Sequence, residues 1–136
     1  MAVDSDAEVR ELLGMETIAV VGCSRNPGKA AHDVPRYMRD QGYDVIPVNP
    51  NADEIFDRPA YDRLADVEEV VDLVNVFRPS DEAGSVIDEA LARDDARVIW
   101  LQRGIRDDEA ADRAEAAGRR VVQDRCIKVD HQRLLG

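Results

Sequence analysis

The sequence has few of the residues on which metal centres and disulfide frameworks depend. Its 136 residues include two cysteines, Cys23 and Cys126, and two histidines, His32 and His131. No CxxC pair occurs and the histidines are isolated, so no metal site is predicted. The cysteines lie far apart in a chain without a recognisable secretory signal, and both thiols are expected to be reduced.

Long hydrophobic runs are also lacking. The apolar runs are about as long as a strand, far short of the ~18–20 residues of a membrane-spanning helix. The N-terminal stretch MAVDSDAEVRELLG is acidic and has no positive region before an apolar core, which argues against a secretory signal. The sequence therefore predicts a cytoplasmic protein without a membrane partner.

Lysine is scarce, and positive charge is outweighed overall. Lys29 and Lys128 are the only lysines, and 18 basic residues stand against 29 acidic ones, for a formal charge of -11. No basic stripe with interleaved aromatic residues occurs, so a nucleic-acid partner is not expected. Such strong self-repulsion is screened by salt, and the composition predicts a halophilic source.

Short apolar runs alternate with helical patterns along the chain. The runs are rich in Val and Ile and apolar on both faces, which is typical of buried parallel strands; they cover 17–21, 44–48, 72–76, 97–101 and 120–123. Helices are predicted at 5–13, with Ser5 as N-cap, and at 31–41, 80–93, 107–117 and 126–134. Residues 51–69 are interpreted as a loop with a small strand and one helical turn.

This alternation predicts an α/β fold for residues 1–136 as a single domain. The expected architecture is Rossmann-like: a doubly wound parallel five-stranded sheet of order 3-2-1-4-5 with helices on both faces. Ligands of such sheets bind outside the carboxyl ends of the strands where the order reverses. In this order the reversal lies between the first and fourth strands.

Basic residues cluster at these predicted strand ends. The first run leads into IAVVGCSRNPGK, where a strand ends at Gly22 and a helix follows, a geometry that suits a phosphate. Seven of the 18 basic residues fall in the few loops after the strands, which predicts a multiply charged anion as ligand: Arg25, Lys29, Arg78, Arg103, Arg106, Arg125 and Lys128.

Two common phosphate motifs are not matched. The loop between Gly22 and Gly28 lacks the GxGxxG pattern, and Asn49 stands where a ribose-binding carboxylate is expected. Five residues separate the two glycines and Ala30 follows Lys29, which argues against a P-loop NTPase. A regulatory module that binds NAD or another nucleotide remains an alternative.

Nucleophilic catalysis has weaker support. Cys126 follows a strand beside Arg125, but His131 lies five residues on and so on another helical face; a structural role is favoured. Cys23 could be a reactive thiol, although a small residue where backbone approaches a ligand is the simpler interpretation. A cysteine-dependent thiol or acyl-transfer enzyme is the second alternative. Trp100 is expected in the core.

Five segments in order resemble the small stand-alone CoA-binding domain family, whose domain also occurs in the succinyl-CoA ligase alpha subunit. They are VVGCSRNPGK, GYDVIPVNPN, VNVFRPS, IWLQRGI and VVQDRCIKVDHQRL. The resemblance implies a Rossmann-like fold that binds coenzyme A or an acyl-CoA. The ligase's catalytic phosphohistidine belongs to a separate domain, so a non-catalytic binding protein is expected, with a protein partner or homo-oligomer left open.

The resemblance also implies which residues contact CoA. The loop after the first strand would contact the pyrophosphate, the end of the second strand the adenosine, and the next two strand ends the nucleotide or pantetheine. Where the ligase-type domain has a lysine after the second strand, this chain has Asn51 beside Asp53 and Glu54. The implied binding residues are Gly22, Cys23, Ser24, Arg25, Asn26, Lys29, Asn49, Asn51, Phe77, Arg78, Pro79, Gln102, Arg103 and Gly104.

Overall fold

The fold is built on one five-stranded parallel sheet, seen in a computed structural model that describes residues 5–136. The strands are β1 (Thr17–Val21), β2 (Asp44–Val48), β5 (Leu73–Val76), β6 (Val98–Leu101) and β7 (Arg120–Val122). All strand pairs are parallel. The predicted α/β class and parallel sheet are confirmed; the start of the predicted non-secretory N-terminus, residues 1–4, lies outside the described residues.

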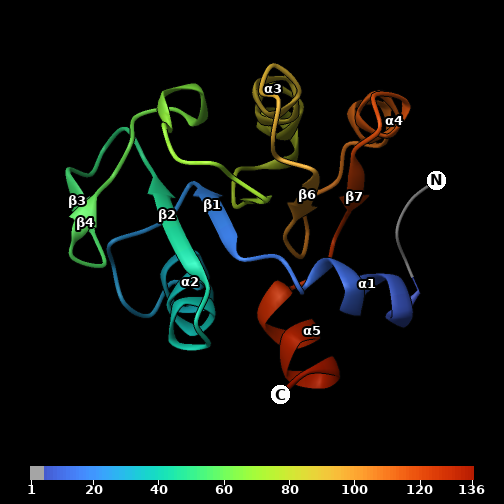
Figure 1. The fold of residues 1–136 in the computed structure, drawn as a ribbon. Helices are drawn as coiled ribbons and strands as arrows, with labels where there is room; N and C mark the ends of the chain where they lie inside the picture. Colours follow the sequence, from blue (N-terminus) through green and yellow to red (C-terminus); the bar gives the residue numbers. More distant parts are fainter. Residues whose placement is uncertain (1–4) are drawn as a thin grey trace.

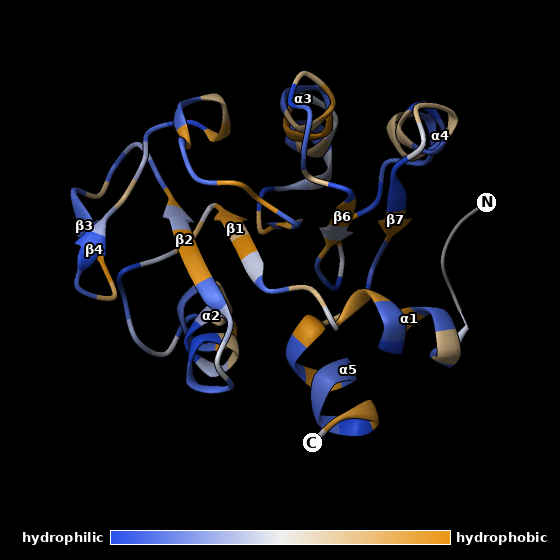
Figure 2. Cartoon of the chain, viewed as in Figure 1, coloured by the Kyte–Doolittle hydropathy of each residue, from blue (hydrophilic) through white to orange (hydrophobic). Residues whose placement is uncertain are grey.

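Helices cover both faces of this sheet (Figure 1). One face carries α3 (Ser80–Leu91) and α4 (Asp108–Ala116), and the other carries α1 (Asp6–Leu12), α2 (Ala30–Asp40) and α5 (Ile127–Leu134). Residues of alternating orientation along each strand supply two apolar cores, one per face, and Trp100 lies fully buried in the second, as predicted. Figure 2 shows β1 and β2 as largely hydrophobic.

The predicted strand order is wrong. In chain order of the five strands it is 2-1-3-4-5, with β5 beside β1 and β2 at the edge. Pro47 is the physical reason: it has no N–H to donate and is tolerated in an edge strand but not between two neighbours. The reversal of strand order therefore lies between β1 and β5, not between the first and fourth strands.

The outer side of β2 is paired with the loop that follows it. The N–H of Tyr61 donates to the Pro47 carbonyl (3.1 Å), and the N–H of Asn49 donates to the Tyr61 carbonyl (2.8 Å). The chain between Asn49 and Tyr61 forms the short antiparallel strands β3 (Glu54–Ile55) and β4 (Arg58–Pro59), and the single turn η1 (Leu64–Asp66) follows. The loop predicted at 51–69 thus contains a small hairpin and one helical turn.

Pro35 connects α2 to the loop that precedes it. The helix begins at Ala30, so Pro35 lies in its second turn and cannot donate to the carbonyl of Ala31. That carbonyl accepts instead from the N–H of Ser24 (2.9 Å). The proline therefore fixes the loop after β1 against the helix. No helix within residues 5–136 is long and apolar enough to cross a bilayer.

Candidate functional site

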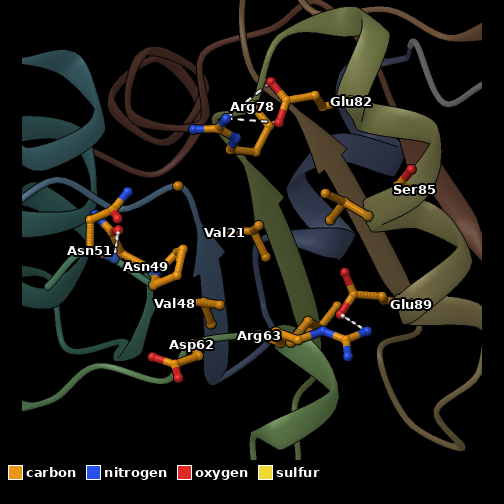
Figure 3. Close-up of a pocket in the computed structure, with 14 residues that line it drawn as sticks. Val21, Val48, Asn49, Asn51, Asp62, Arg63, Arg78, Glu82, Ser85 and Glu89 are labelled. Carbon is orange, nitrogen blue, oxygen red and sulfur yellow. Dashed lines mark hydrogen bonds and ion pairs between the residues drawn. The ribbon is translucent and has the colours of Figure 1, made fainter. Parts of the chain in front are cut away.

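A cleft of about 370 Å³ lies at the carboxyl ends of β1 and β2, on the α3 side of the sheet (Figure 3). It is therefore next to the point where the strand order reverses, where open α/β sheets bind ligands. Its walls come from the ends of β1 and β2, the segment at 62–64, and α3. The lining residues are Val21, Gly22, Val48, Asn49, Pro50, Asn51, Asp62, Arg63, Leu64, Arg78, Glu82, Ser85, Val86 and Glu89.

Gly22 lets Arg78 lie across the end of β1. Gly22 has a φ of +87°, and a Cβ there would come within 3.0 Å of Arg78 Cδ and 3.3 Å of the Phe77 carbonyl group. Any side chain at position 22 would be strained in this conformation and would also displace Arg78. Glycine thus allows the arginine stem to cross the strand end and bring its guanidinium to the cleft.

Two arginines of the cleft are held by glutamates of α3. Arg78 Nη2 donates to both carboxylate oxygens of Glu82 (2.8 and 3.0 Å), and Arg63 lies 3.6 Å from Glu89. Figure 3 shows the two pairs at opposite ends of the cleft. With Asp62, the lining has three carboxylates and two guanidiniums, so the cleft itself has no excess of positive charge.

Asn49 joins the ends of two strands. Its Nδ2 donates to the Cys23 carbonyl (2.8 Å), and its Oδ1 accepts from the N–H of Asn51 (2.8 Å). The residue predicted to lie near adenosine therefore shapes the cleft wall through its own amide, while the Asn51 side chain is exposed.

The loop after β1 exposes its cations and buries its thiol. Arg25, Asn26 and Lys29 are exposed, and no side-chain hydrogen bond or ion pair of Arg25 or Lys29 occurs within residues 5–136. The Ser24 hydroxyl accepts from the N–H of Asn26 (3.1 Å). Cys23 is fully buried, and burial raises the pKa of its thiol to about 12, which argues against the reactive-thiol alternative at this position.

The predicted contacts after β5 and β6 lie outside the cleft lining, except for Arg78. Phe77 is half-buried against the core on the α2 side, and Pro79 is the N-cap of α3. Gln102 is buried, and its Oε1 accepts from the Asn75 amide (3.2 Å) and the N–H of Ile127 (3.0 Å). Gln102 thus connects β5, β6 and α5.

Gly104 and Arg103 form an exposed turn after β6. Gly104 has a φ of +85°, and its N–H donates to Asp124 Oδ1 (2.6 Å). The side chain of Arg103 has no hydrogen bond or ion pair to any described residue. Together with Arg25 and Lys29 it gives the carboxyl edge three cations that no carboxylate of residues 5–136 neutralises.

The other bases of the predicted anion cluster are engaged within the protein. Arg106 pairs with Asp108 (2.8 Å), and Arg125 pairs with the buried Asp130 (2.7 Å). Burial of Asp130 opposes its ionisation, but the hydrogen bonds from Arg125 and Arg133 outweigh it and lower its pKa. Lys128 lies over the Tyr37 ring, 5.5 Å from its centroid.

Sequence reasoning missed the α3 side of the cleft. Glu82, Ser85, Val86 and Glu89 recur at the spacing of one helical face, within a helix that the sequence did predict. That spacing could have indicated that these residues share one face of the helix. No sequence pattern indicates that the segment at 62–64 lines the cleft, because only the pairing of Tyr61 with β2 brings it there.

The lining residues provide no cysteine or histidine for nucleophilic catalysis. Cys126 is half-buried at the N-cap of α5. His131 is buried, and its Nδ1 lies 2.7 Å from the Tyr37 hydroxyl, so its ring is engaged with α2. His32 is buried as well and contacts Phe56 with the two rings tilted, their centroids 5.0 Å apart. No cluster of metal-ligating side chains occurs within residues 5–136.

Comparison with known proteins assigns the family. The uncharacterized protein YneT of Bacillus subtilis is 42% identical over 128 residues, which cover 93% of this chain and 94% of that protein. A Thermus thermophilus structure matches with a TM-score of 0.91 at 43% identity, over 97% of this chain and 100% of that one. An ADP-forming acetate–CoA ligase of Methanocaldococcus jannaschii is 29% identical over 84 residues, 62% of this chain but 12% of the ligase. A family model described as a CoA binding domain matches residues 16–132, and the chain belongs to that family.

Proposed function

We propose that this protein binds coenzyme A or an acyl-CoA at the carboxyl edge of its sheet in the cytoplasm and catalyses no reaction itself. One observation carries the proposal: the loop that leaves the cleft at Gly22 carries two cations, Arg25 and Lys29, that no carboxylate of residues 5–136 neutralises, and the cleft lies at the reversal of strand order. CoA combines phosphates with a long, largely uncharged remainder. Arg25 and Lys29 would hold the pyrophosphate, and the cleft beside Asn49 and Asn51 would receive the adenosine end.

The composition of the cleft lining supports a binding role. The lining has neither cysteine nor histidine, and the buried Cys23 thiol is held protonated at neutral pH. The partial match to an ADP-forming acetate–CoA ligase supports CoA as the ligand class. A stand-alone member of the family would then carry, sense or buffer CoA species, or regulate a partner protein.

Calorimetry with CoA, acetyl-CoA and NADH in high salt tests the proposal. We expect heat and a thermal shift with the two CoA compounds, and Arg25→Glu is expected to abolish both with little loss of stability. Arg97→Glu is the matched control, because Arg97 is exposed beside the opposite end of β6. Binding of NADH in preference to CoA, or retained affinity in Arg25→Glu, would contradict the proposal.

A further inference from the structure

We infer that Glu82 sets the affinity of this protein for the 3′-phosphate of CoA by competing for Arg78. The inference rests on the proposed function and adds a residue that controls specificity within it. Arg78 is the cation of the cleft that Gly22 positions, since its stem crosses that glycine within 3.0 Å of where a Cβ would stand. The path of the stem over Gly22 therefore directs the guanidinium toward the cleft.

The Arg78 guanidinium is only partly used by its own protein. Glu82 takes both of its hydrogen bonds from a single nitrogen, Nη2, and a guanidinium has five N–H donors. No described residue accepts from the donors on Nε and Nη1. Arg78 and Glu82 are 45% and 49% exposed, so an incoming phosphate can reach both partners.

A phosphate monoester and the Glu82 carboxylate would compete for hydrogen bonds from the Arg78 guanidinium. Arg78 lines the cleft together with Asn49 and Asn51, where the adenosine end is proposed to lie, and the 3′-phosphate is carried on that ribose. The pyrophosphate, by contrast, is assigned to Arg25 and Lys29 on the neighbouring loop. Both forked donor pairs of a guanidinium, Nε with Nη2 and Nη1 with Nη2, use the nitrogen that Glu82 occupies. Bidentate binding of the 3′-phosphate must therefore weaken the pair with Glu82, so the glutamate lowers the affinity for this one group.

Asp81 provides a matched control for charge. It is exposed in the first turn of α3 next to Glu82, and it has no ion pair with any residue in 5–136. Asp81→Asn and Glu82→Gln therefore remove the same charge from almost the same place. Only the second change releases Arg78, so the difference between the two variants isolates the competition.

The experiment measures binding of CoA and of 3′-dephospho-CoA by calorimetry at fixed salt to five proteins: the unchanged protein, the three single variants at positions 78, 81 and 82, and the double variant at positions 78 and 82. Glu82→Gln should bind CoA about two- to fivefold more tightly than Asp81→Asn, the range expected for an exposed ion pair. Arg78→Gln should bind CoA about tenfold more weakly than the unchanged protein, since a hydrogen-bonded charge pair is lost. Neither change should alter the affinity for 3′-dephospho-CoA.

The outcomes separate this inference from the proposed function. Equal effects on CoA and 3′-dephospho-CoA, or equal affinities of Glu82→Gln and Asp81→Asn for CoA, would overturn the role of Glu82 while leaving CoA binding intact. Failure of the unchanged protein to bind either compound would overturn both. In Arg78→Gln/Glu82→Gln, the gain from the glutamate change should vanish; a persistent gain would show that Glu82 acts only through its charge.

Discussion

The reactivity of the Cys23 thiol is set by its burial, although the residue lies in the loop that follows β1. Its side chain belongs to the core between β1 and α2, and desolvation raises the pKa of its thiol to about 12. We therefore expect iodoacetamide near pH 8 to leave Cys23 unmodified in native protein and to alkylate it after unfolding in urea. Mass spectrometry of the Cys126→Ser variant gives the measurement; alkylation of native Cys23 at the rate of a free thiol would contradict it.

His131 makes stability depend on pH in a defined direction. Burial lowers its pKa, so the unfolded chain takes up a proton that the folded protein resists. Stability is then complete above the unfolded pKa of about 6.5 and falls as the pH drops through it toward the lower folded value. Urea unfolding at several pH values should show this loss.

The variant His131→Gln provides the comparison. It should flatten the loss of stability just below the unfolded histidine pKa. An unchanged pH profile in His131→Gln would exclude this histidine as the cause.

At the scale of elements, one half-buried arginine, Arg93, holds the cleft wall to the rest of the fold. Arg93 pairs with Asp95 (2.7 Å) and donates to the carbonyls of Leu64, Val67 and Glu69. The segment that brings Arg63 and Leu64 to the cleft is thereby tied to the end of α3. Lysine could not replace Arg93 here, because its single ammonium group lacks the planar fork of donors that reaches all these acceptors.

Arg93→Ala should cost about 2–3 kcal/mol of unfolding free energy, because three carbonyls and a half-buried carboxylate lose their donor. Arg106→Ala, which breaks an exposed pair with Asp108, should cost less than about 1 kcal/mol. Urea titration of both variants makes the comparison. Similar losses in the two variants would argue against an anchoring role for Arg93.

The strands were predictable from sequence, but their order was only partly so. Strands apolar on both faces are the signature of a covered parallel sheet, and every predicted strand lies within one residue of the observed one. The prediction of the strand order was wrong, although Pro47 indicates that its strand lies at an edge of the sheet. The β3–β4 turn was not predictable in the same way, because its two left-handed residues are Phe56 and Asp57 rather than glycine.

The candidate site was likewise predictable only in part. Four predicted residues, Gly22, Asn49, Asn51 and Arg78, line the cleft, because strand ends follow directly from strand positions. The other predicted contacts lie around it, and their part in CoA binding stays a prediction. Arg78 and Glu82 have the i,i+4 spacing of helical ion pairs, but Arg78 precedes the first residue of α3, so the spacing alone did not predict the pair.

For the whole molecule, the formal charge of -11 predicts a dependence on salt. Repulsion among like charges opposes the compact state, and salt shortens its range. We expect the melting temperature to rise as KCl is increased from about 0.1 M to about 2 M, where the screening length falls well below ~10 Å. Thermal unfolding followed by circular dichroism gives the measurement.

A charge-reduced variant separates screening from other effects of salt. Asp94→Lys and Asp112→Lys change exposed residues and together bring the formal charge from -11 to -7. Their combination should flatten the salt dependence of the melting temperature. An undiminished dependence would assign the effect to salt acting on apolar hydration instead.

The covering of β2 has a consequence for contacts between molecules. An exposed strand edge is a template onto which a foreign strand can add. Here Arg58 Nη1 donates to the Val45 carbonyl (3.0 Å) and Tyr61 donates to that of Pro47, while Pro47 offers no donor. A strand from another molecule meets occupied acceptors there, so edge-to-edge aggregation is blocked on this side. Any assembly made by extending the sheet must form at β7, which has only three residues.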